Sequence, residues 1–139
     1  MTVLDTNVVS EPLRPSPAPQ VLAWLDAQDP RTLFLSTVSV AELLVGAAYL
    51  PEGRRRSELE AGIANAVAQL FGDRLLPFDL AAATAFAPMM AKARAQGVPV
   101  SFADGQIAAM AATRGFAVAA RDVEPSKAIG ARVIDPWMT

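Results

Sequence analysis

The chain has 139 residues, enough for one domain with a sizeable core, and 53% of them are hydrophobic. It contains no cysteine and no histidine, and its formal net charge is −2. These counts exclude disulfides, zinc sites built from nitrogen and sulfur ligands, and catalysis that needs a Cys nucleophile or a His base. The carboxylates, hydroxyls and amides that remain suit hard cations such as Mg²⁺ and Mn²⁺.

The apolar stretches of the chain are too short to cross a membrane. The two longest, Val38–Leu50 and Leu80–Ala91, are interrupted by Glu42 and Pro88, and neither reaches the roughly 18 apolar residues that a span needs. The first residues show no basic region and no cleavage site, so we expect no signal peptide. We therefore expect a cytoplasmic protein.

The first half of the chain predicts two buried strands and three helices. The apolar runs Thr2–Leu4 and Leu33–Ser36 are typical of short buried strands. Pro17 at a first helical position predicts a helix to about residue 28. Two capping boxes, Ser39 with Glu42 and Ser57 with Glu60, predict helices that continue to about residues 49 and 71.

The second half continues the alternation of strands and helices. Strands are predicted at residues 75–76, 116–120 and 132–134, and helices at residues 79–96 and 101–114. Strands that alternate with helices favour a parallel sheet. We therefore predict an α/β fold, a central and mostly parallel sheet flanked by helices, in a single domain over residues 1–139.

Four acids lie just after predicted strands or in the first turns of predicted helices. Asp5 and Asp122 follow predicted strands, and Glu42 lies in the first turn of the helix after the second strand. Because ligands bind outside the carboxyl ends of parallel strands, these three acids should converge there. Asp104 would join them if its helix begins at the same edge of the sheet.

Each acid also has a purely structural interpretation. Glu42 and Asp104 occupy the third position of capping boxes, and Asp5 and Asp122 could be turn residues. Those interpretations do not predict that all four gather at one edge. Clustered anions repel one another and favour a bound cation, which can activate water for attack on a phosphate.

The same residues lie in segments by which the chain resembles the PIN-domain ribonucleases, in particular the VapC and FitB toxins of type II toxin–antitoxin systems. The matching segments are Leu4–Glu11, Ser39–Leu43, Ala103–Ala109, Arg121-Asp122 and Asp135-Pro136-Trp137. The resemblance implies a PIN fold and Mg²⁺-dependent endoribonuclease activity, with Mn²⁺ as an alternative metal. It also implies an RNA substrate and a small DNA-binding antitoxin that inhibits the toxin.

The resemblance also implies roles for individual residues. Asp5, Glu42, Asp104 and Asp122 would be the catalytic acids, and Asp5 and Asp104 the direct metal ligands. Thr6 and Asn7 would support the site through local hydrogen bonds, although an ordinary turn after a strand explains them nearly as well. The chain has Ala120 where the family often has Thr before the Arg-Asp pair, which puts the geometry around Asp122 in doubt.

Two other functions compete with this one. A haloacid-dehalogenase-like phosphatase also has an Asp after its first strand, but it needs a second Asp where this chain has Asn7. The main alternative is a non-catalytic PIN-like subunit that dimerises and holds a DNA-bound partner. The four acids argue against it, because a structural subunit has no need of them.

Two expectations concern assembly. By resemblance, we expect the antitoxin to pack along an apolar groove and to place an Arg or Lys at the four acids, where it can pair with a carboxylate. The resemblance also implies a homodimer, and the high apolar content fits a buried contact between two copies.

Overall fold

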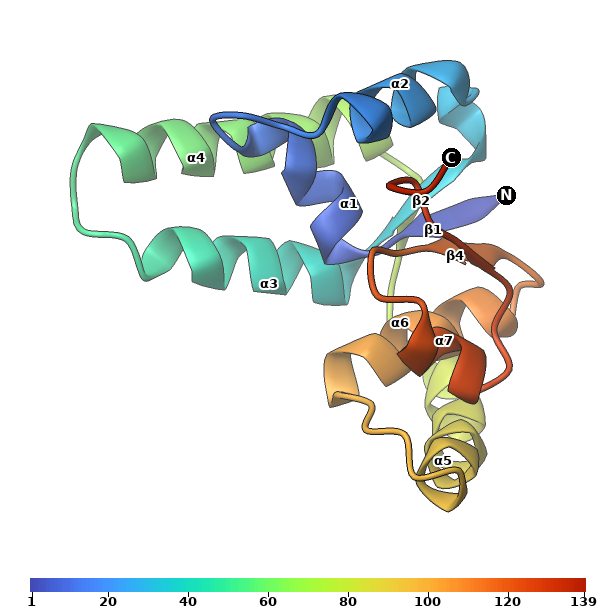
Figure 1. Cartoon of the computed structure of the whole chain (residues 1–139). Coiled ribbons are helices and arrows are strands. Elements are labelled where there is room, and N and C mark those ends of the chain that lie inside the picture. Colours follow the sequence, from blue (N-terminus) through green and yellow to red (C-terminus); the bar gives the residue numbers. More distant parts are fainter.

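Five short strands form one parallel sheet at the centre of the protein, in the order β3-β2-β1-β4-β5 (Figure 1). The computed structural model describes all residues from 1 to 139. The strands are β1 (Thr2–Leu4), β2 (Leu33–Ser36), β3 (Leu75–Leu76), β4 (Ala117–Ala119) and β5 (Val133–Ile134). Every pairing in the sheet is parallel, as the sequence predicts.

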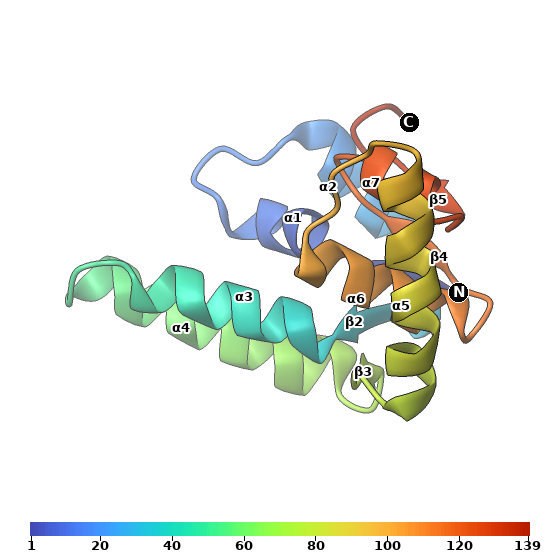
Figure 2. The same cartoon turned by 90° about the horizontal axis from the view of Figure 1, so that it is seen from below.

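Helices cover both faces of this sheet. They are α1 (Thr6–Ser10), α2 (Pro19–Ala27), α3 (Thr37–Ala48), α4 (Arg54–Asn65), α5 (Leu80–Ala95), α6 (Phe102–Ala112) and α7 (Glu124–Ala128). Two 3-10 turns, η1 (Glu11–Leu13) and η2 (Pro30–Thr32), and a π-helical segment, η3 (Ala66–Phe71), complete the chain. Helices α5, α6 and α7 lie on one side of the sheet and α1 and α2 on the other, while α3 and α4 form an antiparallel pair that projects from it (Figures 1 and 2).

The core is divided by the alternation of side chains along the strands. Val3 and Val118 belong to a cluster with Ile107 and Met110 of α6. Their neighbours face the other way, into a cluster on the side of α1 and α2. Successive strand residues point to opposite faces of a sheet, so these three-residue strands contribute to both layers. No helix is long and apolar enough to cross a membrane.

Three predicted helix starts are wrong. Helix α2 begins at Pro19, after the N-cap Ala18, so Pro17 lies before it. The N-cap of α3 is Ser36, whose side chain accepts a hydrogen bond from the Val38 amide, so Ser39 lies inside the helix. Helix α4 begins at Arg54, after Gly53 with φ 150°, so Ser57 also lies inside its helix. Neither proposed capping box is formed. The structural explanation of Glu42 as a capping residue therefore does not apply.

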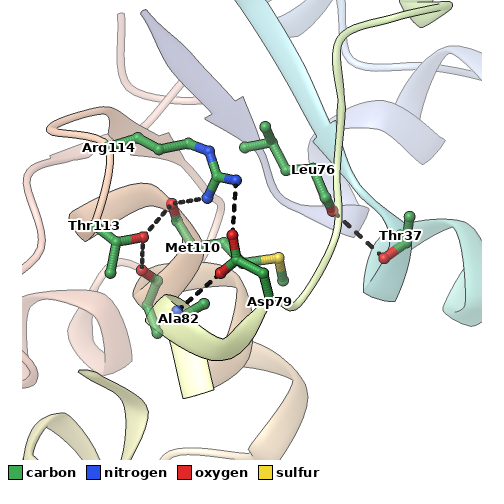
Figure 3. A network of polar contacts seen from close by, with 8 residues as sticks. Thr37, Leu76, Asp79, Ala82, Met110, Thr113 and Arg114 are labelled. Atoms are coloured by element: carbon green, nitrogen blue, oxygen red, sulfur yellow. Dashed lines mark hydrogen bonds and ion pairs between the residues drawn. The ribbon is translucent and has the colours of Figure 1, made fainter. Parts of the chain in front are cut away.

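Polar contacts fix where α5 and α3 begin (Figure 3). Asp79, the expected N-cap of α5, accepts a hydrogen bond from the Ala82 amide and lies 3.4 Å from the Arg114 guanidinium. Arg114 also donates to the Met110 carbonyl near the end of α6, so it joins the two helices. Thr37 donates to the carbonyl of Leu76, which ties the start of α3 to β3.

Candidate metal centre

Asp5 lies at the point where the order of the sheet reverses. From β1 the chain builds outward through β2 and β3, and then returns to the other side of β1 for β4 and β5. Ligands in open α/β sheets bind at such a switch point, outside the carboxyl ends of the strands. The Asp5 amide donates to the Ala119 carbonyl of β4 over 2.9 Å, which holds Asp5 between the two central strands.

The electrostatic surroundings of Asp5 are unfavourable to its charge. The pKa of its carboxyl is raised from 3.8 to about 6, first because burial disfavours the charged form. The charges of Asp104, Glu42 and Asp122, in that order, also raise this pKa, whereas the backbone amide of Thr6 lowers it. The other three acids therefore lie close enough to Asp5 for each of their charges to raise its pKa.

Glu42 is connected to Asp5 through the next residue of the chain. The Thr6 hydroxyl donates to the Glu42 carboxylate over 2.7 Å, although the two residues are 36 positions apart. The Thr6 oxygen also lies 3.0 Å from the hydroxyl of buried Ser39. Since Thr6 has one hydroxyl proton, Ser39 is the donor in that bond. Thr6 was expected to bond locally, and it bonds instead to two residues of α3.

Asn7, the second expected supporting residue, has a different place. It is an exposed residue of α1, and its carbonyl accepts a hydrogen bond from Ser10. Thr6 and Asn7 both lie in a short helix, α1, and not in the ordinary turn that was the alternative.

Asp104 stands in the first turn of α6, where its amide donates to the Ser101 hydroxyl over 3.1 Å. The return bond of a capping box, from the Ser101 amide to the Asp104 carboxylate, is absent. Of the three neighbouring acids, Asp104 raises the pKa of Asp5 the most. Helix α6 therefore begins at the same sheet edge as Asp5, which is the condition that the sequence left open.

Asp122 lies on the exposed loop between β4 and α7, and its carboxylate accepts a hydrogen bond from the Glu124 amide over 3.3 Å. The preceding residue, Arg121, stacks over the Trp137 ring at 5.4 Å from its centroid. Ala120 is buried in the core, so no hydroxyl stands beside Asp122 at that position.

Glu11 is an acid whose role the sequence analysis missed. It is buried, and its carboxylate accepts hydrogen bonds from the Ala18 amide over 2.9 Å and from Arg14 over 3.3 Å. The Ala18 amide and then Arg14 hold its pKa below the ordinary value. Glu11 fixes the segment between α1 and α2 and is not a free acid. The mixed polar and apolar residues around it gave no signal of this burial.

The four acids fit a hard cation by their chemistry. Five other acids of the chain are in ion pairs, namely Glu11, Asp29, Glu58, Glu60 and Asp79. None of the four candidate acids has such a partner, so the protein itself does not neutralise them. No three acids lie close enough together to form a metal cage. Mg²⁺ commonly uses one or two carboxylates and keeps several waters, so this spacing is compatible with it.

Two cavities adjoin these residues. The first, which we call the polar cavity, has a volume of about 350 Å³ and is lined by residues that include Thr6, Arg14, Glu42 and Arg55. The second, the apolar cavity, has a volume of about 290 Å³ and lies between β2, α2 and η3. Leu13, Leu43 and Ile63 line both, so the two cavities are neighbours.

A parallel sheet with unpaired acids at its switch point defines an α/β protein of the kind that binds ligands or metals at that edge. Its family follows from comparison with known proteins. The PIN domain family model matches residues 2–129, and the chain belongs to this family.

The similar proteins identify the type of PIN domain as that of the VapC and FitB toxins. The chain is 46% identical over 137 residues to the VapC ribonuclease Y4jK of Sinorhizobium fredii, covering 99% of this chain and 98% of that protein. It is 40% identical to toxin FitB of Neisseria gonorrhoeae, covering 99% of each. The solved structure of FitAB bound to a DNA fragment contains a similar chain, with a TM-score of 0.93, 39% identity, and 99% and 96% of the two chains covered.

Proposed function

We propose that this protein is a Mg²⁺-dependent endoribonuclease, the toxin of a type II toxin–antitoxin pair that acts in the cytoplasm. The observation that carries the proposal is the environment of Asp5, a partly buried carboxylate without an ion pair. Its pKa is raised first by burial and then by the charges of three further acids. Such an arrangement stabilises a bound cation and destabilises the metal-free site. Similarity to a protein named as a ribonuclease supports RNA as the substrate.

The four acids and Thr6 have different proposed roles. Asp5 and Asp104 are the proposed metal ligands, because their charges interact most strongly. Glu42 and Asp122 add negative charge around them, and Thr6 holds the Glu42 carboxylate in place. When bound, Mg²⁺ (or Mn²⁺) would stabilise charge on the phosphate under attack and activate water.

The experiment that tests the function is incubation of the purified, metal-loaded protein with mixed pools of transfer, ribosomal and messenger RNA. Cleavage that stops when EDTA is added supports the nuclease. Clean inactivity against every RNA class, together with retained binding of an antitoxin, would instead favour the non-catalytic dimerisation subunit.

We infer that the partner is a small DNA-binding antitoxin, which the likeness to a DNA-bound FitAB complex supports. The apolar cavity can accept aliphatic side chains, and the neighbouring polar cavity reaches Glu42. An antitoxin segment with apolar residues followed by an Arg or Lys could therefore bridge the two. Copurification of no small partner would contradict this, as would inhibition that survives removal of every basic residue from the segment that contacts the toxin.

We also infer a homodimer from an apolar surface on α3. Leu44, Val45 and Tyr49 are exposed there, Tyr49 to 84%. Val45 and Tyr49, the C-cap of the helix, are one turn apart, and Leu44 is next to Val45. Exposed apolar side chains that gather in this way are typical of an interaction surface. We call these three residues the α3 apolar face.

A further inference from the structure

One arginine in the basic run Arg54–Arg56 is left without a partner. Arg54 pairs with Glu58 over 2.8 Å and Arg56 with Glu60 over 2.7 Å, each one turn along α4. Arg55 makes no ion pair and no side-chain hydrogen bond. It stands in the first turn of α4, where the helix dipole disfavours a positive charge. Nothing within the protein therefore compensates the charge of Arg55.

The surroundings of Arg55 connect it to the candidate metal centre. It lines the polar cavity with Arg14 and Ser10, and the same cavity is lined by Thr6 and Glu42. Arg14 uses one nitrogen to pair with Glu11, but its side chain is 57% exposed. Its guanidinium carries five N–H groups, so donors remain for a ligand. The cavity is therefore lined by one acid of the candidate metal centre, Glu42, and by two arginines, Arg14 and Arg55.

We propose that Arg55, assisted by Arg14, binds a backbone phosphate of the RNA next to the phosphate that is cleaved. This proposal rests on the ribonuclease function proposed above and assigns a phosphate subsite to the polar cavity. Guanidinium groups recognise phosphates through paired N–H donors. Arg14 and Arg55 attract a polyanion, whereas Glu42 in the same cavity is the group that the basic residue expected of an antitoxin would reach.

The cavity can also accommodate the rest of a nucleotide. Gly46 of α3 lies in its wall, and a Cβ added there would meet no atom within 4 Å. Leu43, Leu50 and Leu59 provide aliphatic surface beside it. A larger side chain at position 46 would therefore fill the cavity without removing any charge.

The proposal is tested by binding in the absence of cleavage. Fluorescence anisotropy with a labelled single-stranded oligoribonucleotide, in EDTA and over a range of salt concentrations, compares wild type with Arg55→Ala. The slope of log K against log salt is negative, and each lost phosphate contact reduces its magnitude by about 0.7 for single strands. We expect that decrease for Arg55→Ala, with affinity reduced roughly three- to tenfold. Arg54→Ala, the neighbouring and paired arginine, should change neither quantity.

One further variant and one further measurement separate the possible outcomes. Gly46→Leu should weaken RNA binding at an unchanged salt slope, because it blocks space and removes no charge. In cleavage assays with Mg²⁺, Arg55→Ala should raise KM and leave kcat unchanged. Thermal unfolding of each variant confirms that the chain is folded.

Several results would overturn the subsite. They are the absence of RNA binding by wild type, equal affinities and slopes for Arg55→Ala and Arg54→Ala, or an Arg55→Ala defect confined to antitoxin binding. A wild type that binds RNA through Arg55 and never cleaves it would instead contradict the proposed function and leave the subsite standing.

Discussion

Among single residues, Asp5 carries the strongest mark of a functional role. The acids that stabilise the fold, such as Glu11 and Asp79, are bonded to amides and arginines of the protein. Asp5 instead has no ion pair, and apart from the Thr6 amide its carboxylate is surrounded by apolar burial and by three other negative charges, which raise its pKa. A carboxylate in such a position costs stability unless a cation is bound, and this cost can be measured.

The first prediction is a pH dependence of stability that comes from Asp5. Its pKa is about 6 in the folded chain against an ordinary 3.8, so the folded state binds the proton more tightly than the unfolded state. The free energy of unfolding of the metal-free protein should therefore include a contribution that is present at pH 4, falls as the pH rises to about 6, and then stays constant. The expected fall is roughly 1–3 kcal/mol, since one pKa unit corresponds to about 1.4 kcal/mol.

Denaturant unfolding in EDTA from pH 4 to 7 measures this contribution as the difference between wild type and Asp5→Asn. The comparison removes the titration of all other acids, which the two proteins share. Curves that run parallel across this pH range would show that Asp5 has an ordinary pKa.

At the scale of secondary structure, the packing of α5 against α6 depends on Gly105. A Cβ at this position would come within 2.5 Å of the Met90 sulfur and 2.8 Å of the Phe86 ring. Phe86 is itself held between Phe78 and Phe102, with ring centroids 5.7 and 5.5 Å away. The absent side chain therefore lets the start of α6, which carries Asp104, lie close to α5.

The second prediction compares the same substitution at two helical glycines. Gly105→Ala should lower the free energy of unfolding by about 1–2 kcal/mol, because overpacking outweighs the gain in helix propensity. Gly46→Ala meets open space and should raise it by up to about 1 kcal/mol. Both are measured by denaturant unfolding. Equal effects of the two substitutions would refute this account of the α5–α6 contact.

The sequence predicted all five strands and the site-bearing ends of β1 and β4, because short apolar runs and glycine stops are strong local signals. It misplaced the starts of α2, α3 and α4. Ser36 is both the last residue of β2 and the N-cap of α3. The helix has therefore already begun before Ser39 and Glu42, and these two residues cannot cap it. The helices α1 and α7 were missed, because five residues are too few to show helical periodicity.

The candidate site was predictable only in part, because some of its contacts join segments that are far apart in the sequence. Strand order places Asp5 and Asp122 at one edge, and a topological argument can anticipate that. The bond from Thr6 to Glu42 depends on how α1 lies against α3, which no local pattern in the sequence encodes. The stacking of Arg121 on Trp137 is likewise a contact between distant segments.

For the whole molecule, the most conspicuous feature is the α3–α4 pair that projects from the sheet (Figure 2). Helix α3 carries the α3 apolar face on its outside and Glu42 at its base. If two copies meet through this face, their acidic sites are brought toward one another. A single groove for RNA could then run across both subunits.

The third prediction is that the protein without its antitoxin is a dimer held by the α3 apolar face. Light scattering at high micromolar concentration should give twice the chain mass for wild type. Tyr49→Lys should shift the protein toward monomer, because a charge would be buried at the contact. Met138→Lys places the same charge at another exposed apolar residue and should leave the dimer intact. A monomeric wild type would exclude the homodimer.

The central claim is that the clustered acids hold a metal for RNA cleavage and do not serve the fold. The measurement is thermal unfolding of wild type, Asp5→Asn and Asp104→Asn, with and without Mg²⁺, beside an RNA-cleavage assay on the same samples. Each substitution removes one charge and nearly preserves shape. We predict that both variants are at least as stable as wild type without metal, while stabilisation by Mg²⁺ and cleavage are lost.

A different result is expected if these acids serve the fold. If Asp104 mainly stabilises the helix terminus, Asp104→Asn should cost up to about 1 kcal/mol of stability and leave cleavage per folded molecule unchanged. Variants that are less stable than wild type without Mg²⁺, yet still cleave RNA at the wild-type rate, would contradict the assignment of these acids as a metal centre.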